Sequence, residues 1–408
     1  MIVGGHAEME RQWVAYLCLF AAALLASVLM TPVAARVARR FDAIDYPDRR
    51  RINRSPIPRM GGIAIFSGIL AMLLARYLGS RYLGWLMVFV PSPHLRDVDY
   101  PLLGLAFVII FLTGLVDDCC SLSPRQKLFG QVAAACVAVA GGLVIGDVVN
   151  PFEVASLLHV GWLTYPVTVL YLVAYVNIFN LIDGLDGLAS GIAFIASMTL
   201  FVLSLLRGQV DAASLAIAIA GSALGFLRFN FHPASIFLGD SGSLLLGFSL
   251  ATVSLLSVTR ISSLTTILVP LVVAGIPIID TLSAIVRRRR AHVSVGQADR
   301  GHIHHRLLDE GFDQRQTVLV IYAWTVMLSV GAIVLTQIAP IPRITVFMLL
   351  VAASGLFAAK LRLFSPVLLH HYNPRTGHDE IITPQDPAFE KEEARFEQEH
   401  NARVPFRK

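Results

Sequence analysis

The stretch 177-NIFNLIDGLDGLASG-191 follows a long apolar segment and carries four polar side chains at three-residue intervals: Asn177, Asn180, Asp183 and Asp186. We call these four residues the polar ladder. Amides and carboxylates are costly beside hydrocarbon, so the ladder needs polar partners, water or a metal ion. In a helix of about 3.6 residues per turn, four such positions drift halfway round the axis. Glycine follows both aspartates and permits a tight turn, so we expect the chain to leave the helix near Asp183.

The composition around the ladder is that of a membrane protein. Of the 408 residues, 55% are hydrophobic and only 15% are charged, and the mean hydropathy is +0.67, whereas soluble domains carry about 25% charged residues. Spanning lipid as a helix takes about 20 mostly apolar residues, because the backbone must be satisfied within the segment. Candidate spans lie near 13–34, 61–78, 101–117, 127–147, 166–182, 189–206, 212–228, 242–259, 263–286, 318–338 and 343–360. We therefore predict an all-α, polytopic integral membrane protein with about eleven transmembrane helices.

The distribution of lysine and arginine predicts how these helices cross the membrane. Eighteen of these residues fall in loops after odd-numbered spans, and five fall in the opposite loops. Because cytoplasmic loops carry the excess of positive charge, the odd-numbered loops are predicted to be cytoplasmic. The domain prediction is a single transmembrane catalytic domain over residues 1–360 and a polar cytoplasmic tail over 361–408.

Every conspicuous polar cluster falls in one of these cytoplasmic loops. In chain order the clusters are 56-PIPRMGG-62, 116-VDDCCSLSPRQK-127, the ladder segment, 229-FNFHPASIFLGDSGSLLLG-247 and 298-ADRGHIHHRLLDEG-311. The outer loops contain nothing comparable. Five clusters on one face predict one active site built from cytoplasmic loops on a helical scaffold.

The charges in these clusters favour phosphate chemistry with a metal ion. The acids are Asp117, Asp118, Asp183, Asp186, Asp240 and Asp280. Helix capping explains one or two of them, but six converging carboxylates repel each other unless a cation lies among them. Oxygen ligands without a soft sulfur site favour Mg²⁺ or Mn²⁺. Lys127, Arg228, Arg300 and the run Arg287 to Arg290 supply positive charge in the same loops, although the run is also typical of a membrane anchor. Acids for a metal and bases for phosphate are typical of phosphoryl transfer.

Two of the motifs allow more than one interpretation. The turn Gly239 to Ser243 opens a predicted helix, so its backbone N–H groups could hold an oxyanion beside Asp240, or the turn is a plain helix cap. His302, His304 and His305 are candidate zinc ligands, but no cysteine or acid stands at a spacing that completes a tetrahedral site. Phosphate binding is the favoured interpretation, and solvated loop histidines are the alternative.

Taken together, the five motifs resemble the polyprenyl-phosphate N-acetylhexosamine-1-phosphate transferase family of bacterial membranes, over roughly residues 40–312. The form HIHHRLL resembles the N-acetylglucosamine-1-phosphate branch. The phospho-N-acetylmuramoyl-pentapeptide branch has three consecutive histidines, a run that Ile303 interrupts here. The resemblance implies transfer of a sugar-1-phosphate from a UDP-sugar to undecaprenyl phosphate, with release of UMP. It also implies a multi-pass protein of the bacterial cytoplasmic (inner) membrane that starts a cell-envelope glycopolymer such as O antigen, common antigen or teichoic acid.

The resemblance also implies a role for each residue that matches a family motif. Asp240 matches the magnesium ligand, and Asp117 and Asp118 match paired acids near the metal and the lipid phosphate. The other implied groups are the nucleotide-facing Asn180, Asp183 and Asp186, the uracil-side Asn230 and Phe237, and the phosphate-facing Lys127, His302, His304 and His305. The implied chemistry is direct attack of the lipid phosphate on the UDP-sugar, and a two-step route through Asp117 or Asp118 is the alternative.

Other protein classes fit the sequence less well. A membrane prenyltransferase also uses aspartate and Mg²⁺, but its acids recur at helical i, i+4 spacing. A transporter would place carboxylates near the bilayer midplane in two related halves, and the sequence contains no such repeat. The pI of 9.1 needs no nucleic-acid partner, because anionic head groups and substrates lie beside the arginines. The sequence leaves open the sugar, the glycopolymer and whether the protein is a homodimer.

Overall fold

The computed structural model describes residues 2–46, 55–85, 98–145, 147–149, 157–158, 161–257, 261–262, 273–290, 301–361, 363–364, 369–373 and 378–382. The chain divides into two compact units. Unit 1 comprises Met1–Pro277 and Gln314–Met348, and unit 2 comprises Ile278–Asp313 and Leu349–Lys408.

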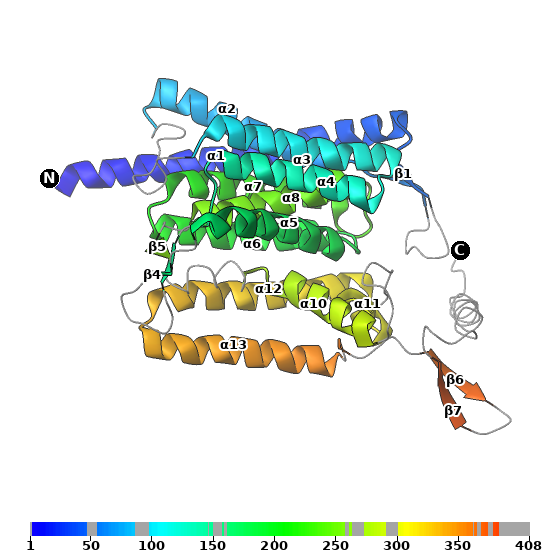
Figure 1. Cartoon of the computed structure of the whole chain (residues 1–408). Coiled ribbons are helices and arrows are strands. Elements are labelled where there is room, and N and C mark those ends of the chain that lie inside the picture. Colours follow the sequence, from blue (N-terminus) through cyan, green and yellow to red (C-terminus); the bar gives the residue numbers. More distant parts are fainter. Residues whose placement is uncertain are drawn as a thin grey trace. The chain divides into compact units, whose positions relative to one another are not determined.

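The helices of the chain are long and apolar (Figure 1). Within the described residues, nine segments are long and apolar enough to cross a membrane. They are Gln12–Arg40 within α1 (Ile2–Arg40), α2 (Gly62–Leu83), α3 (Tyr100–Cys120), Gly161–Ile182 ending in α5 (Thr164–Ile182), α6 (Leu188–Leu206), α7 (Val210–Asn230), α8 (Gly239–Leu256), α12 (Gln314–Gln337) and Pro342–Lys360 within α13 (Pro340–Lys360). The predicted class, an all-α polytopic membrane protein, is confirmed.

Two of the eleven predicted spans have a different outcome. The fourth is α4 (Pro124–Ala140), whose 17 residues make it shorter than the nine segments above. The ninth falls partly on residues 263–272, which lie outside the described part of the chain, and continues into α10 (Gly275–Arg290). The count of eleven therefore stays a prediction.

The strands are short and do not change this class. A two-stranded sheet pairs β1 (Ile44–Asp45) with β2 (Ile57–Pro58), and a second sheet has the order β4 (Leu157–Leu158), β3 (Asp147–Val149), β5 (Ile261–Ser262). In unit 2, β6 (Leu369–Asn373) and β7 (His378–Ile382) form an antiparallel hairpin within the predicted tail. Unit 2 also contains α11 (Ile303–Asp309).

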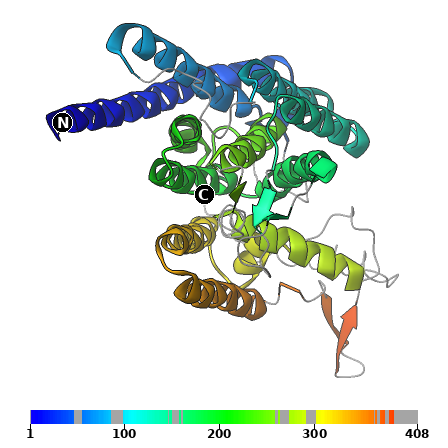
Figure 2. The ribbon, with the colours of Figure 1, turned by 60° about the vertical axis from the view of Figure 1, so that its left-hand side comes forward.

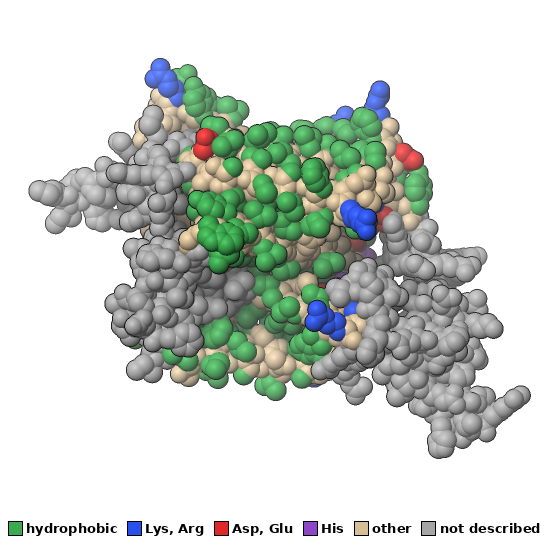
Figure 3. Space-filling model, in the orientation of Figure 1, with side chains coloured by type: hydrophobic (Ala, Val, Ile, Leu, Met, Phe, Trp, Pro, Cys, Tyr) green, Lys and Arg blue, Asp and Glu red, His purple; other side chains and the backbone are tan. Residues whose placement is uncertain are grey.

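The core of unit 1 is built around α8. This helix packs against α2, α3, α5, α6 and α7, and the views in Figures 1 and 2 show it among them. A helix that is apolar all round belongs in the interior, and α8 is buried from Ser241 to Leu256. Close helix packing depends on small residues: a Cβ at Gly221 or Gly225 of α7 would meet backbone oxygens of α1. Figure 3 shows hydrophobic side chains along the outward face of the helices, as expected beside lipid.

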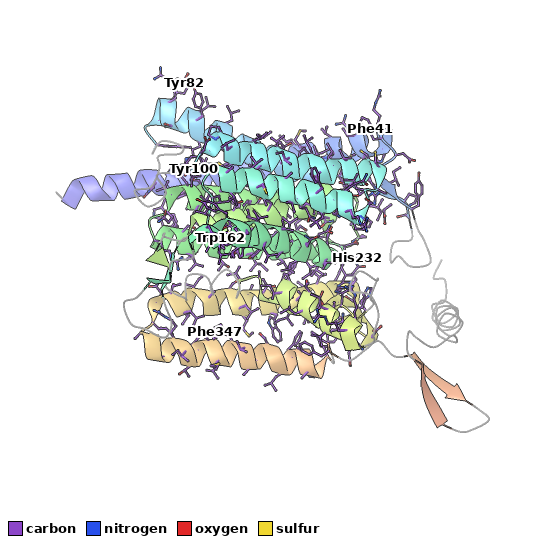
Figure 4. All side chains as sticks on the ribbon, viewed as in Figure 1. Phe41, Tyr82, Tyr100, Trp162, His232 and Phe347 are labelled. Carbon is purple, nitrogen blue, oxygen red and sulfur yellow. The ribbon has the colours of Figure 1, made fainter. Side chains whose placement is uncertain are left out.

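The two ends of unit 1 differ in composition. Tyr82, Tyr100 and Trp162 lie at one end, and Phe41 and His232 lie at the other (Figure 4). Tyr82 and Trp162 are strongly exposed, and tyrosine and tryptophan are typical of membrane–water interfaces. The end with Phe41 and His232, which we call the polar end, is also where α3 is followed by α4, α5 by α6 and α7 by α8. The predicted loop motifs of unit 1 therefore meet at this end.

Candidate active site

The turn between α3 and α4 brings an acid and a base together. Asp117 accepts a hydrogen bond from the Leu122 N–H at 2.7 Å. Ser123 caps α4 in a reciprocal capping box with Gln126, so the sequence starts the new helix directly after the turn. Lys127 then lies in the first turn of α4, and its Nζ is 3.0 Å from Asp117 Oδ2.

Lys127 links three elements at the polar end. Besides Asp117, its ammonium donates to Asp240 Oδ1 at the start of α8 and to Asn180 Oδ1 near the end of α5, the latter at 3.2 Å. Asn180 in turn donates to Asp240 Oδ1 and to Ser243 Oγ. One ammonium thus lies between two part-buried carboxylates and an amide.

Asp118 performs a different task from its neighbour Asp117. Its two carboxylate oxygens accept the backbone N–H groups of Asp240 at 2.8 Å and Ser241 at 3.1 Å. A carboxylate at a helix N-terminus interacts favourably with the helix dipole. Of the two interpretations of the GDSGS turn, the structure therefore supports the helix cap, which Asp118 supplies from another helix. We call Asp117, Asp118, Lys127, Asn180 and Asp240 the polar cluster.

Gly239 makes this cap sterically feasible. Its φ is +70°, in the left-handed region that favours glycine. A Cβ at this position would lie 2.7 Å from each Asp118 carboxylate oxygen. The glycine therefore permits both the turn into α8 and the close approach of the capping carboxylate.

The polar ladder leaves the helix where the sequence predicted. α5 ends at Ile182, Asp183 takes φ −76° and ψ +58°, and α6 begins at Leu188 after Gly187 at φ +80°. The four ladder residues then have four different environments. Asn177 pairs with Gln131 of α4 through an Nδ2–Oε1 hydrogen bond of 2.7 Å, which is a contact between two helices. Asn180 joins the polar cluster.

The two aspartates of the ladder also differ from each other. Asp186 accepts from the Ala234 N–H at 3.1 Å and lies 2.8 Å from His232 Nδ1. The half-buried Asp183 carboxylate has no hydrogen bond or ion pair with the described residues. Burial, followed by the charges of Asp240, Asp118 and Asp186, raises the pKa of Asp183 to about 8. At neutral pH this side chain is therefore mostly protonated, and it becomes a hydrogen-bond donor.

Asn230 and Phe237 both help to join two loops. Asn230 is the last residue of α7, and Phe237 lies in the segment 231–238 that follows it. The buried Asn230 amide accepts from the Gly187 N–H at 3.1 Å and from Ser190 Oγ at 2.8 Å, and it donates to the Ile236 carbonyl at 3.0 Å. Phe237 exchanges backbone hydrogen bonds with Pro58 and Gly61, so the PIPRMGG motif lies beside the seventh loop. The predicted uracil-side role of both residues stays a prediction.

The three predicted histidines belong to unit 2. Asp280 accepts the Ile303 N–H at 2.7 Å and lies 2.8 Å from His302 Nδ1, so it anchors the start of α11. The rings of His302 and His304 stack, and those of His304 and His305 are tilted against each other. His304 is buried, and this burial, together with the charge of His305, lowers the pKa of His304 to about 3. A neutral imidazole at physiological pH follows for this side chain.

Of the arginines in the predicted loop clusters, Arg287 has a structural role and Arg300 falls outside the described residues. Arg287 is buried, and its guanidinium donates to Ser283 Oγ and to the Leu363 carbonyl that follows α13. This contact within unit 2 fits a cation near a helix C-terminus. Arg300 lies outside the described residues.

Sequence reasoning missed several polar residues that hold the site. His232 stands inside a quoted motif, so its spacing from the ladder is a signal that could have found it. Gln131 and Tyr322 lie on apolar helices, and Tyr322 donates to the Gly187 carbonyl at 2.5 Å. Nothing in the local sequence marks either of them, because their partners are distant in the chain.

The donor set of the polar cluster fits a hard divalent cation. Within the described residues, no group of three or more His, Cys, Asp or Glu side chains is arranged to hold a metal ion. Mg²⁺ is usually bound through one or two carboxylates, several waters and substrate phosphates, so it needs no such group. The ammonium of Lys127 already lies between Asp117 and Asp240, which shows that this position favours positive charge.

Comparisons with known proteins agree on one family. Residues 100–258 match the sequence profile of glycosyl transferase family 4. The chain is 37% identical, over 80% of its length and 87% of the relative, to a Bacillus subtilis protein named "Probable undecaprenyl-phosphate N-acetylglucosaminyl 1-phosphate transferase". It is 36% identical to the decaprenyl-phosphate N-acetylglucosaminephosphotransferase of Mycobacterium tuberculosis, over 72% and 76% of the two chains. It is 31% identical to the phospho-N-acetylmuramoyl-pentapeptide-transferase of Moorella thermoacetica, over 78% and 97%.

Proposed function

The chain belongs to glycosyl transferase family 4, and from this premise we propose that it transfers N-acetylglucosamine-1-phosphate from UDP-N-acetylglucosamine to undecaprenyl phosphate. It is a multi-pass membrane protein and a phosphoglycosyl transferase. The proposal adds the donor, the acceptor, the use of Mg²⁺ and the release of UMP. The product starts a cell-envelope glycopolymer.

The observation that carries the proposal is the contact of one ammonium with two carboxylates at the polar end. Lys127 lies 3.0 Å from Asp117 and also donates to Asp240 and Asn180. These residues come from the starts or ends of α3, α4, α5 and α8. A site of this kind, built from loops beside an apolar helical surface, suits a reaction between a water-soluble nucleotide and a lipid phosphate.

The reaction is a single displacement at phosphorus. An oxygen of the polyprenyl phosphate forms a bond to the β-phosphorus of the UDP-sugar, the bond from that phosphorus to the bridging oxygen breaks, and UMP leaves with the bridging oxygen. Two anions must approach each other, so positioning and charge neutralisation dominate the catalysis. Asp240 would hold Mg²⁺, which would neutralise phosphate charge when bound.

The residues of this chain have distinct tasks in that displacement. Lys127 donates hydrogen bonds to phosphate oxygens as negative charge develops there. Asp117 orients the lipid phosphate or accepts its proton. Asn180 holds the Asp240 carboxylate through its amide, and Asp183 faces the donor nucleotide.

The direct route is favoured over a covalent intermediate at Asp118. Both oxygens of that carboxylate already accept backbone N–H groups of α8, so attack by Asp118 would cost both bonds. Single turnover without the lipid acceptor separates the routes. Direct displacement predicts no UMP before the acceptor is added. Prompt UMP release with a phospho-sugar-labelled protein would establish the covalent route.

A second candidate donor is UDP-N-acetylmuramoyl-pentapeptide. It is supported by the 31% identity to the relative named phospho-N-acetylmuramoyl-pentapeptide-transferase. Against it stand the interrupted histidine run at Ile303 and the relatives at 36% and 37% identity that are named for N-acetylglucosamine.

The arginine-rich loops support a cytoplasmic position of the polar end in a bacterial inner membrane.

A donor screen tests the proposal. The purified protein, in nanodiscs with undecaprenyl phosphate, is supplied with UDP-N-acetylglucosamine, UDP-N-acetylgalactosamine or the muramoyl-pentapeptide nucleotide, and UMP is measured. We expect UMP release with UDP-N-acetylglucosamine, its loss on chelation and its recovery with Mg²⁺. Lys127→Met serves as the inactive control. No turnover of any UDP-sugar would refute the assignment.

A further inference from the structure

α12 makes two polar contacts with loops at the polar end, although it lies outside residues 100–258. In its first turn, Arg315 Nε donates to the His232 carbonyl at 3.2 Å. Two turns later, the Tyr322 hydroxyl donates to the Gly187 carbonyl at 2.5 Å. The two residues are seven apart in the sequence and therefore lie on the same side of the helix. All four residues belong to unit 1.

The Tyr322 contact ends at a fixed point of the ladder loop, residues 183–187. Gly187 has φ +80°, and its N–H donates to Asn230 while its carbonyl accepts from Tyr322. The residue opposite the tyrosine is Gly191, where a Cβ would lie 1.9 Å from the tyrosine hydroxyl oxygen. The glycine of α6 thus makes room for the aromatic side chain.

The Arg315 contact and the Tyr322 contact are connected through His232 and Asp186. Arg315 holds the backbone of His232, and the His232 ring lies 2.8 Å from the Asp186 carboxylate. Asp186 is followed directly by Gly187, which returns to α12 through Tyr322. Two loops that are more than forty residues apart in the sequence are therefore held to one rigid helix and to each other.

We propose that Tyr322 and Arg315 are positioning residues, through which α12 fixes the loops 183–187 and 231–238 in the geometry that binds the donor nucleotide. The inference rests on the proposed function, because that function makes these loops the nucleotide-facing part of the site. Neither residue is required to touch the substrate. The alternative is that both contacts only satisfy polar groups where helices pack.

Tyr322→Phe distinguishes a positioning role from a contact that only satisfies polar groups, because it removes the hydroxyl and keeps the ring that packs on Gly191. The matched control is Tyr171→Phe, whose hydroxyl shares a 2.7 Å hydrogen bond with Ser254 between α5 and α8 and contacts neither loop. We expect Tyr322→Phe to raise the KM for the UDP-sugar roughly three- to tenfold, the effect of one hydrogen bond. The kcat and the KM for the lipid phosphate stay within about twofold.

Amide hydrogen exchange supplies a second readout that does not depend on turnover. In Tyr322→Phe the amides of residues 184–188 are expected to exchange faster than in the wild type, since the loop opens locally. Tyr171→Phe leaves both the KM and the exchange at these amides unchanged. Arg315→Gln is expected to accelerate exchange in residues 232–236 and to raise the same KM.

The outcomes separate the inference from the proposed function. An unchanged KM and unchanged exchange in Tyr322→Phe would overturn the positioning role, as would a fall in kcat at constant KM. Equal effects of Tyr322→Phe and Tyr171→Phe would assign the change to general packing and also overturn it. A wild-type protein that turns over no UDP-sugar refutes the proposed function, and then the exchange experiment alone decides whether α12 holds the two loops.

Discussion

Replacing Gly239 with alanine is expected to disable the site through Asp118, although neither residue need touch the substrate. The backbone at Gly239 has φ +70°, and the added Cβ would lie 2.7 Å from both oxygens of the Asp118 carboxylate. The carboxylate must then move away from the start of α8. Asp240, whose own N–H is one of the two that Asp118 holds, moves with that turn.

The structure separates the two costs of this substitution. A left-handed backbone costs an L-residue about 1–2 kcal/mol. The loss of two hydrogen bonds from a charged acceptor adds about 3 kcal/mol, so Gly239→Ala should lower the free energy of unfolding by about 4 kcal/mol. Gly208 has φ +66° and open space around its Cβ direction. Gly208→Ala therefore carries the backbone cost alone, about 1 kcal/mol.

Activity and stability are measured for both variants in the same nanodiscs. We expect Gly208→Ala to keep wild-type UMP release, and Gly239→Ala to lose about 100-fold in kcat, the effect of a misplacement of about 1 Å. The comparison removes the shared backbone strain. Equal activity losses in the two variants, or an active Gly239→Ala protein, would refute the role of Asp118 as the residue that positions Asp240.

Three further predictions concern other parts of unit 1. Asn180→Leu should reduce UMP release about 100-fold because Asp240 loses a direct partner, whereas Asn177→Leu should stay within about threefold because that side chain faces α4; the reverse order would contradict the site. Arg76→Met should lower the free energy of unfolding by about 2–3 kcal/mol because the part-buried Asp211 carboxylate, 2.7 Å from the guanidinium, keeps the Tyr100 hydroxyl but loses the opposite charge, and adding Asp211→Asn should restore most of the loss; a double variant as unstable as the single one argues against a charge pair. Because the pKa of Asp183 rises from 3.8 in the unfolded chain to about 8 in the fold, the folded state binds the proton more tightly, and stability should fall as the pH rises from about 4 to about 8. Thermal denaturation without metal should show a flatter profile for Asp183→Asn, and parallel profiles for the two proteins would exclude a raised pKa.

The end of α5 was predictable because its causes are local. Glycine after Asp183 and after Asp186 weakens the helix within five residues, and polar side chains enter at the same place. The gathering of separate motifs was predictable for a different reason. Helices of similar length cross one slab in alternating directions, so alternate loops must share a face.

The division of labour between Asp117 and Asp118 could not be read from the sequence. Two adjacent acids at the end of α3 point in different directions, and which one meets α8 depends on how closely the helices pack. That closeness is set by Gly114, where a Cβ would lie 2.4 Å from the Asp240 carbonyl oxygen. Likewise, the three hydrogen bonds of Asn230 reach residues brought together only by tertiary structure.

The cap formed by Asp118 also bears on the proposed use of a cation. A free helix N-terminus would attract a substrate phosphate, but the first N–H groups of α8 already hold a carboxylate. The positive end of that helix is therefore neutralised before any substrate arrives. In the polar cluster, two carboxylates contact the single ammonium of Lys127 and a third caps α8, and the proposed reaction adds a pyrophosphate and a lipid phosphate. Negative charges of this size repel each other strongly in a low-dielectric site, and further positive charge offsets that repulsion. The same contact that orders Asp240 thus supports the proposed use of a divalent cation.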